Sequence, residues 1–429
     1  MTDAIEIQPV ASPIQATVRP PGSKSITNRA LVCAALAQGR SVLRGALDSE
    51  DTQVMIASLR RLGVAVTTDD GGRTLIVDGC NGDITAGEAE LFVANSGTTM
   101  RFLTALATLG QGTFRLDGVH RMRERPIGDL ANALNALGSD VTCLGPGNCP
   151  PVLVRARGLA GGDAGIRGDI SSQFLSGLLM AAPYARSPVR VLVDGALVSV
   201  PYVSMTIRVM DAFGGRCQVE GQYAAIGVSH ADRYRGRTYD IEPDASAASY
   251  FFAAAAVTGG RVTVDGLSRD ALQGDVAFCD CLAQMGAKVW YGPNCITVEG
   301  RPLRGIDVDM NGISDTVQTL AVVALFAEGP TRVRNVGHIR HKETDRIAAT
   351  ACELRKLGAA VDESEDGLVI QPPPGGPRGA AIHTYNDHRM AMSFAIAGLR
   401  TPNVVIHDPS CTAKTYPDFF GDLQRLARP

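Results

Sequence analysis

The 429-residue sequence has no Cys-x-x-Cys pair, and among its ten scattered cysteines only Cys279 and Cys281 lie close together. This spacing argues against a zinc site or a redox dithiol, so we expect reduced thiols inside the folded protein. No uninterrupted apolar run reaches the length that spans a bilayer, and the N-terminus lacks the charged and then apolar stretch of an export signal. We therefore predict a soluble, cytoplasmic protein without a membrane partner.

Neither sign of charge is in excess, because 41 basic residues nearly cancel 44 acidic ones. The balance predicts no nucleic-acid partner and no attraction to anionic membranes, so any anion site must be local. Aromatic residues are also scarce, at 5%, whereas glycines number 47 and apolar residues reach 45%. A chain of this length and composition predicts a compact α/β protein with two domains.

A pattern of one glycine-capped helix followed by two β-rich runs recurs along the chain. The capping glycines are separated by 75, 76, 72 and 72 residues: Gly63, Gly138, Gly214, Gly286 and Gly358. Six units of about 72 residues would fill the chain. We expect the sixth unit to be split, with its helix in residues 418–429 and its two strands in residues 5–19. One domain then comprises residues 1–21 plus 242–429, the other residues 22–241, with three units each.

Each unit also carries an Ala- and Leu-rich helix that is apolar on nearly all sides, such as "ASYFFAAAAV". Helices of this kind are buried inside a domain. A strand ending in a turn then leads into a more polar helix. A βαβαββ unit repeated three times per domain, with the apolar helices parallel and buried, accounts for both kinds of helix.

Polar residues gather just before the six apolar helices. They are Ser25 and Thr27, Asn95 and Thr98, Ser171 and Ser172, Asp244, Asp315, and Asp387. Helix capping alone could explain many of them. Parallel helices would also bring their N-termini to one face of each domain, where free N–H groups attract anions. Lys24, Arg29 and Arg101 strengthen that field, and Arg389 at a helix start needs an anion beside it, from the protein or from a ligand.

Three further loops are rich in basic residues: "HRMRERPIG" at 120–128, "RHKETDRIA" at 340–348 and "CTAKTYPDFF" at 411–420. A single basic run is usually a solvated helix face. These runs occupy equivalent loops of several units, so we expect them to converge. Converging arginines need anions to offset their repulsion, and arginine binds carboxylate and phosphate in bidentate fashion. The pattern predicts a cleft between two domains that binds small, multiply anionic substrates.

Eight motifs, in order along the chain, resemble the 5-enolpyruvylshikimate-3-phosphate synthase family. They are "PPGSKSITNRAL", "NSGTTMR", "RMRERPIGDL", "GDISSQFLSGLLMAAP", "YDIEPDASAASYFFAAAA", "HKETDRI", "NDHRMAMS" and "DPSCTAKTYPDFF". The resemblance covers residues from about 20 to about 420 and implies two inside-out α/β domains with two crossover strands. It implies transfer of the enolpyruvyl group of phosphoenolpyruvate to the 5-hydroxyl of shikimate 3-phosphate by addition and elimination.

The resemblance also implies roles for individual residues. Phosphoenolpyruvate would contact Lys24, Asn95, Gly97, Arg125, Arg346, Arg389 and Lys414. Shikimate 3-phosphate would contact Ser25, Arg29, Ser171, Ser172, Gln173, Ser199, Tyr202, Asp315, His338 and Lys342. Asp315 would be the base for the attacking hydroxyl, and Lys24 and Glu343 would move protons at the enolpyruvyl carbon. The partner of Arg389 would then be a substrate anion. The reaction needs no metal and no organic cofactor, and we expect a monomer.

The sequence departs from the family pattern at a few positions. Ser96 and Thr99 stand where many relatives have alanine, and His338 stands where an asparagine often binds the substrate phosphate. Gly97 keeps the small residue usually linked to inhibition by glyphosate, so we expect that inhibitor to act.

Two other functions fit parts of the pattern. The sister transferase that acts on UDP-N-acetylglucosamine shares the fold and the chemistry, but it typically uses a cysteine on the loop that here reads "HRMRERPIG". A non-catalytic repeat scaffold would have no use for Lys24, Asp315 and Glu343.

Overall fold

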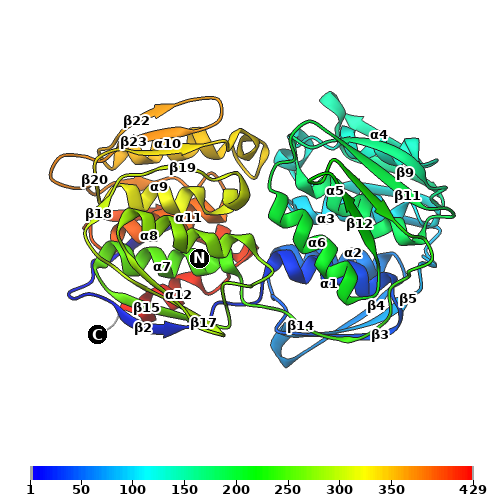
Figure 1. The fold of residues 1–429 in the computed structure, drawn as a ribbon, viewed down its shortest axis with the longest axis horizontal. Coiled ribbons are helices and arrows are strands. Elements are labelled where there is room, and N and C mark those ends of the chain that lie inside the picture. The colour runs from blue at the N-terminus through cyan, green and yellow to red at the C-terminus, as the bar shows by residue number, and fades with distance from the viewer. Residues whose placement is uncertain (1–2, 428–429) are drawn as a thin grey trace. The chain divides into compact units, whose positions relative to one another are not determined.

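The computed structural model describes residues 3–427. The chain forms two compact units: a C-terminal unit of Met1–Pro21 with Glu242–Pro429, and an N-terminal unit of Gly22–Ile241 (Figure 1). Both are mixed α/β structures, which confirms the predicted fold class. Each unit is described by itself below.

The N-terminal unit contains three four-stranded sheets of one pattern. In each, a parallel edge strand pairs with a central strand, and an antiparallel hairpin completes the sheet. In spatial order the sheets are β14 (Thr238–Asp240), β3 (Gln38–Arg44), β5 (Thr74–Cys80) and β4 (Ala65–Asp69); β6 (Glu88–Phe92), β7 (Gln111–Asp117), β9 (Cys149–Arg157) and β8 (Asp140–Gly145); and β10 (Gly162–Arg167), β11 (Val189–Asp194), β13 (Ala225–Val228) and β12 (Cys217–Glu220).

The C-terminal unit repeats this pattern. Its larger sheets are β2 (Gln15–Val18), β15 (Arg261–Asp265), β17 (Cys295–Glu299) and β16 (Lys288–Tyr291); β19 (Asp307–Asp309), β21 (Thr331–Arg334), β23 (Leu368–Gln371) and β22 (Ala360–Glu363); and β24 (Ala381–Ile382), β25 (Val404–His407) and β1 (Ala4–Ile7). A short parallel pair joins β18 (Leu303–Arg304) to β20 (Ala327–Glu328). The third of the larger sheets has three strands where every other large sheet has four.

One expectation for the N-terminal strands is wrong. β1 pairs antiparallel with β25 and so belongs to the sixth repeat, as predicted. β2, however, pairs in parallel with β15 and opens the fourth repeat instead. In the other four large sheets, the central strand takes its parallel neighbour from the strand just before its buried helix. β2 and β14 exchange these partners: β2 precedes the helix at 24–36 but pairs with β15, and β14 precedes the helix at 245–258 but pairs with β3. The reason is that the chain passes from one unit to the other after each of these strands, so each strand pairs within its own unit.

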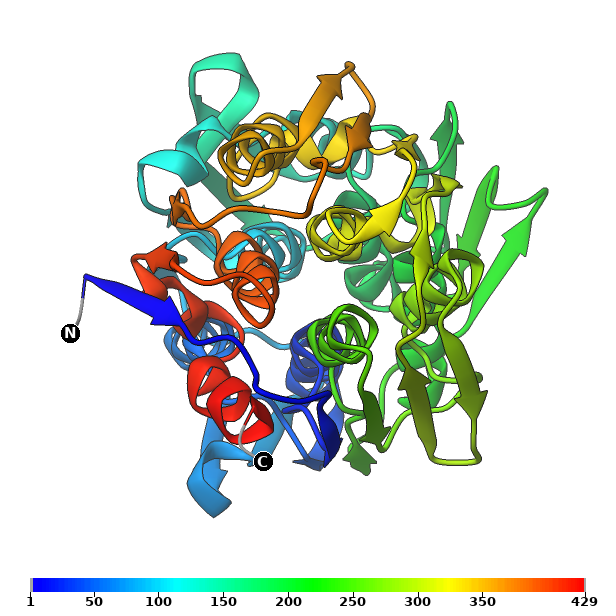
Figure 2. The same ribbon diagram turned by 90° about the vertical axis from the view of Figure 1, so that its left-hand side faces the viewer.

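Six helices form the interior of the two units. They are α1 (Lys24–Leu36), α3 (Gly97–Ala107) and α5 (Ser172–Ala181) in the N-terminal unit, and α7 (Ala245–Thr258), α9 (Val317–Ala324) and α11 (His388–Gly398) in the C-terminal unit. Nearly all of their residues are buried, as an all-apolar helix requires. Figure 2 shows α7, α9 and α11 nearly end-on, in green, yellow and orange, with their axes aligned.

Six more polar helices lie between the central strands and the hairpins: α2 (Glu50–Arg61), α4 (Gly128–Ala136), α6 (Val200–Ala212), α8 (Phe278–Met285), α10 (Arg346–Lys356) and α12 (Phe419–Ala427). The first five each end near one of the five glycines singled out in the sequence, and all five glycines adopt a positive φ between 88° and 115°. Only glycine takes this left-handed conformation without a steric cost, so the glycines end the helices and turn the chain into the next strand.

Candidate active site

The most highly charged buried cluster of the C-terminal unit is built around Arg346. Its guanidinium contacts three carboxylates: Asp315 at 3.1 Å, Glu343 at 2.9 Å and Asp387 at 2.8 Å. The Arg346 side chain is 1% exposed and that of Asp387 is fully buried. Burial by itself would lower the pKa of Arg346, but the carboxylates of Asp387, Glu343 and Asp315 raise it above its ordinary value. A permanently charged group therefore organises this site.

Helix starts bring these groups together. Arg346 is the first residue of α10, whose N-cap Asp345 accepts a hydrogen bond from the amide of Ala348. Asp387 is the N-cap of α11 and accepts from the amide of Arg389 at 2.9 Å. The sequence suggested that Asp315 caps α9, but the N-cap of that helix is Thr316. Asp315 lies in the 3₁₀ turn Asn311–Thr316 before the helix. Its carboxylate is thus left to contact the arginines.

Three more cations complete the cluster. Arg389 donates to Asp315 at 2.7 Å, Lys342 lies 3.5 Å from Asp315, and Lys414 lies 4.0 Å from Glu343. Within the protein, the anion beside Arg389 is therefore the Asp315 carboxylate. Four cations, Lys342, Arg346, Arg389 and Lys414, thus lie beside the three carboxylates. Buried cations gathered in this way create a local positive field that attracts anions.

His338 lies in the 3₁₀ turn Gly337–His341 and is buried. Burial, together with the nearby Lys342 ammonium, lowers the pKa of His338 from its ordinary 6.5 to about 3. The imidazole is therefore neutral at the pH of a cell. Desolvation also lowers the pKa of Lys342, a shift that Asp315 opposes.

We expect the low pKa of His338 to make folding sensitive to acid. Below pH 6.5 the His338 imidazole binds a proton in the unfolded chain, whereas in the folded chain it stays neutral until about pH 3. Stability is therefore lost as pH falls through this window, by up to about 1.4 kcal/mol per pH unit. His338→Gln should remove this part of the dependence, as urea unfolding at pH 7.5, 6.0 and 4.5 would measure. Parallel curves for the two proteins would contradict the assignment.

In the N-terminal unit, two buried arginines lie at the start of α3. Arg125 is buried and donates to the backbone carbonyl of Asn95 at 3.0 Å and to its side-chain oxygen at 3.2 Å. Arg101 donates to the carbonyl of Pro126 at 2.8 Å. Gly97 is the first residue of the helix, and a Cβ built there would lie 2.4 Å from Nη2 of Arg125. The glycine therefore leaves room for the guanidinium.

We expect Gly97→Ala to displace the Arg125 guanidinium and weaken binding of a small anion at the start of α3. The KM for the smaller anionic substrate should rise about tenfold, which corresponds to about 1.4 kcal/mol. Inhibition by glyphosate should weaken in parallel in steady-state assays. Gly87→Ala is the matched control, because a Cβ at Gly87 meets nothing within 4 Å. An unchanged KM in the Gly97 variant, or no inhibition of the parent protein by millimolar glyphosate, would count against these expectations.

Lys24 and Arg29 lie on α1 but differ in what they contact. Lys24 is the first residue of the helix, and its ammonium lies 3.5 Å from Asp51 of α2. Arg29 is 1% exposed and donates to Thr206 at 2.7 Å and to the backbone carbonyls of Ser25 and Tyr202. Burial lowers the pKa of Arg29 to about 10. Arg29 thus joins α1 to α6.

The remaining predicted residues of this unit lie at two helix starts. Ser171 caps α5 by accepting from the amide of Gln173, and Ser172 is buried as the first residue of that helix. Ser199 is the N-cap of α6 in a left-handed conformation, and its carbonyl accepts from the amide of Tyr202. Helix N-termini with hydroxyl groups are suited to phosphate.

Two of the arginines flagged in the loop at 120–128 do not belong to either cluster. Arg121 pairs with exposed Glu124, and Arg123 pairs with Asp117. The first is a solvated ion pair, the ordinary alternative for a basic run, whereas the second joins a half-exposed arginine to a buried carboxylate. The sequence reasoning also missed two contact residues, Asp51 beside Lys24 and Tyr250, whose hydroxyl lies 3.4 Å from Arg389. The two acidic residues at the start of α2 could have indicated Asp51 as a contact of a nearby cation. No feature of the sequence indicated Tyr250.

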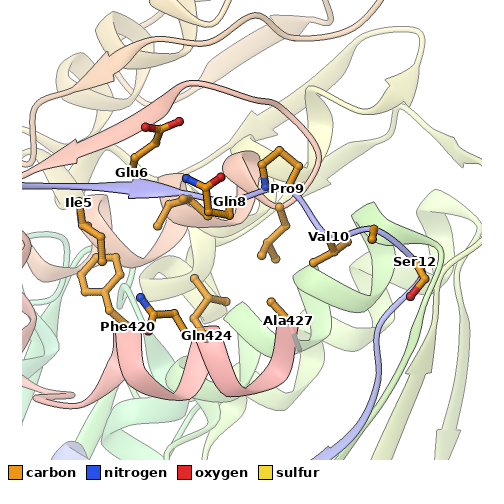
Figure 3. Close-up of a pocket in the computed structure, with 13 residues that line it drawn as sticks. Ile5, Glu6, Gln8, Pro9, Val10, Ser12, Phe420, Gln424 and Ala427 are labelled. Carbon is orange, nitrogen blue, oxygen red and sulfur yellow. The ribbon is translucent and has the colours of Figure 1, made fainter. Parts of the chain in front are cut away.

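An apolar pocket lies apart from these charged groups, between β1 and α12 of the C-terminal unit (Figure 3). It has a volume of about 360 Å³ and no cationic lining residue. Within residues 3–427 no group of three or more His, Cys, Asp and Glu side chains is arranged to hold a metal ion. The helices described are all too short or too polar to cross a membrane.

Comparison with known proteins gives a consistent result. A family model described as EPSP synthase (3-phosphoshikimate 1-carboxyvinyltransferase) matches residues 9–423. The 3-phosphoshikimate 1-carboxyvinyltransferase of Trichormus variabilis is 50% identical over 419 residues, 97% of this chain and 98% of that protein. The chloroplastic enzyme 1 of Nicotiana tabacum is 46% identical, over 99% of this chain and 85% of that protein. The solved EPSP synthase of Acinetobacter baumannii is 26% identical with a TM-score of 0.82, over 99% of this chain and 98% of that one.

Proposed function

The chain belongs to the EPSP synthase family, and from this premise we propose which of its residues carry out the reaction. The protein is a transferase that moves the enolpyruvyl group of phosphoenolpyruvate to the 5-hydroxyl of shikimate 3-phosphate and releases phosphate. The reaction belongs to the shikimate pathway.

We assign the binding of phosphoenolpyruvate to the buried cations. In the C-terminal unit these are Arg346, Arg389 and Lys414, which lie together with Lys342 around Asp315 and Glu343. In the N-terminal unit they are Lys24 and Arg125, with Asn95 and Gly97 beside the guanidinium. A substrate carboxylate or phosphate would compete with Asp315 for Arg389.

The binding of shikimate 3-phosphate is assigned to groups that suit one phosphate and several hydroxyls. Ser171, Ser172 and Gln173 at the start of α5 offer hydroxyl and amide donors to the phosphate. Ser25, Ser199, Tyr202 and Lys342 supply further contacts, and Arg29 holds Ser25 and Tyr202 in position. His338 is neutral and can accept or donate a hydrogen bond, so it can replace an asparagine without adding a charge.

The chemistry needs an acid and a base at fixed positions. Asp315 accepts the proton of the 5-hydroxyl as that oxygen attacks C2 of phosphoenolpyruvate, while C3 is protonated by Lys24 or Glu343. The product of this step is a tetrahedral ketal phosphate. Removal of a C3 proton then expels phosphate and leaves the enol ether. The surrounding arginines hold the anions in place and compensate charge throughout, which supplies proximity and electrostatic stabilisation.

The buried contact of Arg346 with three carboxylates carries this proposal, because it places Asp315 and Glu343 on one guanidinium at 3.1 and 2.9 Å. The test is to mix the protein with phosphoenolpyruvate and either shikimate 3-phosphate or UDP-N-acetylglucosamine and to follow phosphate release. We expect release with shikimate 3-phosphate. Release only with the sugar nucleotide would overturn the assignment, and release with neither would favour a scaffold.

We also propose that the protein acts as a monomer in the cytoplasm. The nearly balanced charge, 41 basic against 44 acidic residues, supports neither a nucleic-acid nor a membrane partner. Sedimentation of the purified protein at micromolar concentration would reveal any dimer.

A further inference from the structure

The sheet of the sixth repeat lacks a strand that every other repeat has. In the five four-stranded sheets, an outer strand pairs antiparallel with the second strand of the hairpin: β4 with β5, β8 with β9, β12 with β13, β16 with β17, and β22 with β23. β1 is the equivalent of that hairpin strand in the sixth repeat, and within residues 3–427 it pairs only with β25. Its outer edge is therefore open.

The pairing with β25 determines which groups of β1 face that edge. The amide of Asp408 donates to the carbonyl of Asp3, so Asp3 and then Ile5 and Ile7 direct their backbone groups toward β25. The backbone N–H and C=O of the alternate residue Glu6 consequently point to the open edge. Pro9, with no N–H, limits how far a ladder could extend.

The pocket described above lies along this edge. We call it the edge groove and define it by Ile5, Ile7, Leu399, Phe420, Leu423 and Ala427. Figure 3 shows Phe420, Gln424 and Ala427 rising from α12 toward β1, with Glu6 on the opposite side of the strand. In the other five repeats the outer helix leads directly into the outer strand. The apolar residues of the edge groove thus lie where, in the other repeats, the outer helix and the outer strand are joined.

The other repeats also show what kind of side chain fills this position. In the sixth repeat, Ile7 of β1 lies opposite Val404, the first buried residue of the central strand β25. The equivalent of Ile7 in another repeat is the hairpin residue that lies opposite the first buried residue of that repeat's central strand. In four of the five complete sheets, a valine of the outer strand is paired with the equivalent of Ile7. These pairs are Val66 with Val77, Val141 with Val154, Val289 with Val298, and Val361 with Ile370. The fifth has Cys217 on Val228. The position takes a small or β-branched side chain.

We propose that the edge groove binds an extended peptide segment of a partner protein, which adds antiparallel to β1 and places a β-branched side chain opposite Ile7. Backbone pairing supplies affinity and the side-chain position supplies selectivity, as in other cases of strand addition. A second copy of this chain fits less well. Full antiparallel pairing of residues 4–8 with the same residues of a copy sets Glu6 directly opposite Glu6, and like charges in that arrangement are unfavourable.

The test uses a labelled synthetic peptide of residues 286–292, Gly-Ala-Lys-Val-Trp-Tyr-Gly, which contains the outer strand β16. By the equivalence of the sheets, Val289 would lie opposite Ile7 and Trp290 opposite Glu6. We expect saturable binding in fluorescence anisotropy and slower hydrogen exchange at the amide of Glu6. N-methylation at Trp290 should weaken binding at least tenfold, whereas N-methylation at Val289 points away from β1 and should have little effect.

Two protein variants complete the test. Glu6→Pro removes the N–H at the open edge while leaving the pairing with β25 intact, and Gln424→Trp fills the edge groove from its exposed side. Both should abolish peptide binding and keep full turnover, while Glu6→Gln should bind normally. Binding that survives both variants, or no saturable binding at about 1 mM peptide, overturns the proposal. So does a dimer in sedimentation that Glu6→Pro dissociates, because the occupant would then be a second copy.

Discussion

Asp315→Asn is expected to lower kcat by about a thousandfold, within the range that one positioned acid or base contributes. An amide cannot take the proton of the attacking hydroxyl. The KM for phosphoenolpyruvate should not rise, because removing one carboxylate from beside Lys342, Arg346 and Arg389 makes the cluster more positive. Steady-state kinetics with each substrate varied in turn would separate the two constants.

The matched control is Asp345→Asn. Asp345 caps α10 and pairs with the half-buried Arg340 at 2.7 Å, so it shares the segment but not the cluster. Its loss should leave kcat within about threefold, because a partly exposed ion pair and one cap affect stability more than chemistry. If Asp315→Asn instead raised KM and kept kcat, Asp315 would be a group that holds the arginines and not the base.

Arg346→Met is expected to destabilise the C-terminal unit by about 3–5 kcal/mol, the usual cost of leaving buried charges without their partner. Asp315, Glu343 and Asp387 all contact this guanidinium, and Asp387 is fully buried. Methionine fills much of the space but offers no charge. The loss should appear as a lower urea midpoint at neutral pH, and activity should disappear with it.

Arg340→Met provides the comparison for stability. Arg340 also pairs with two carboxylates, Asp345 and Glu363, but its side chain is 22% exposed. Solvent screening should keep its cost near or below about 1 kcal/mol. Equal losses in the two variants would mean that the buried cluster is no more important to folding than a surface ion pair. A larger loss for Arg346, which we expect, shows that the site contributes to the stability of its own unit.

Several features of the site could be predicted from neighbouring residues alone. Asp244, Asp387 and Ser171 cap their helices through contacts within three residues, which local sequence determines. The glycines at positions 63, 138, 214, 286 and 358 end helices for a reason that lies in the backbone of each residue. Repetition of these local signals along the chain was enough to predict the repeating α/β architecture and the two kinds of helix.

The pairing of charges was decided only by the tertiary structure. Arg389 contacts Asp315 across 74 residues of chain, and Arg346 contacts Asp387 across 41. The guanidinium of Arg29 donates in the interior to Thr206, which lies 177 residues away in the sequence. β2 likewise joined the fourth repeat and not the sixth. Residue types and caps follow from local sequence because their forces act within a turn, whereas ion-pair and strand partners depend on how distant segments pack.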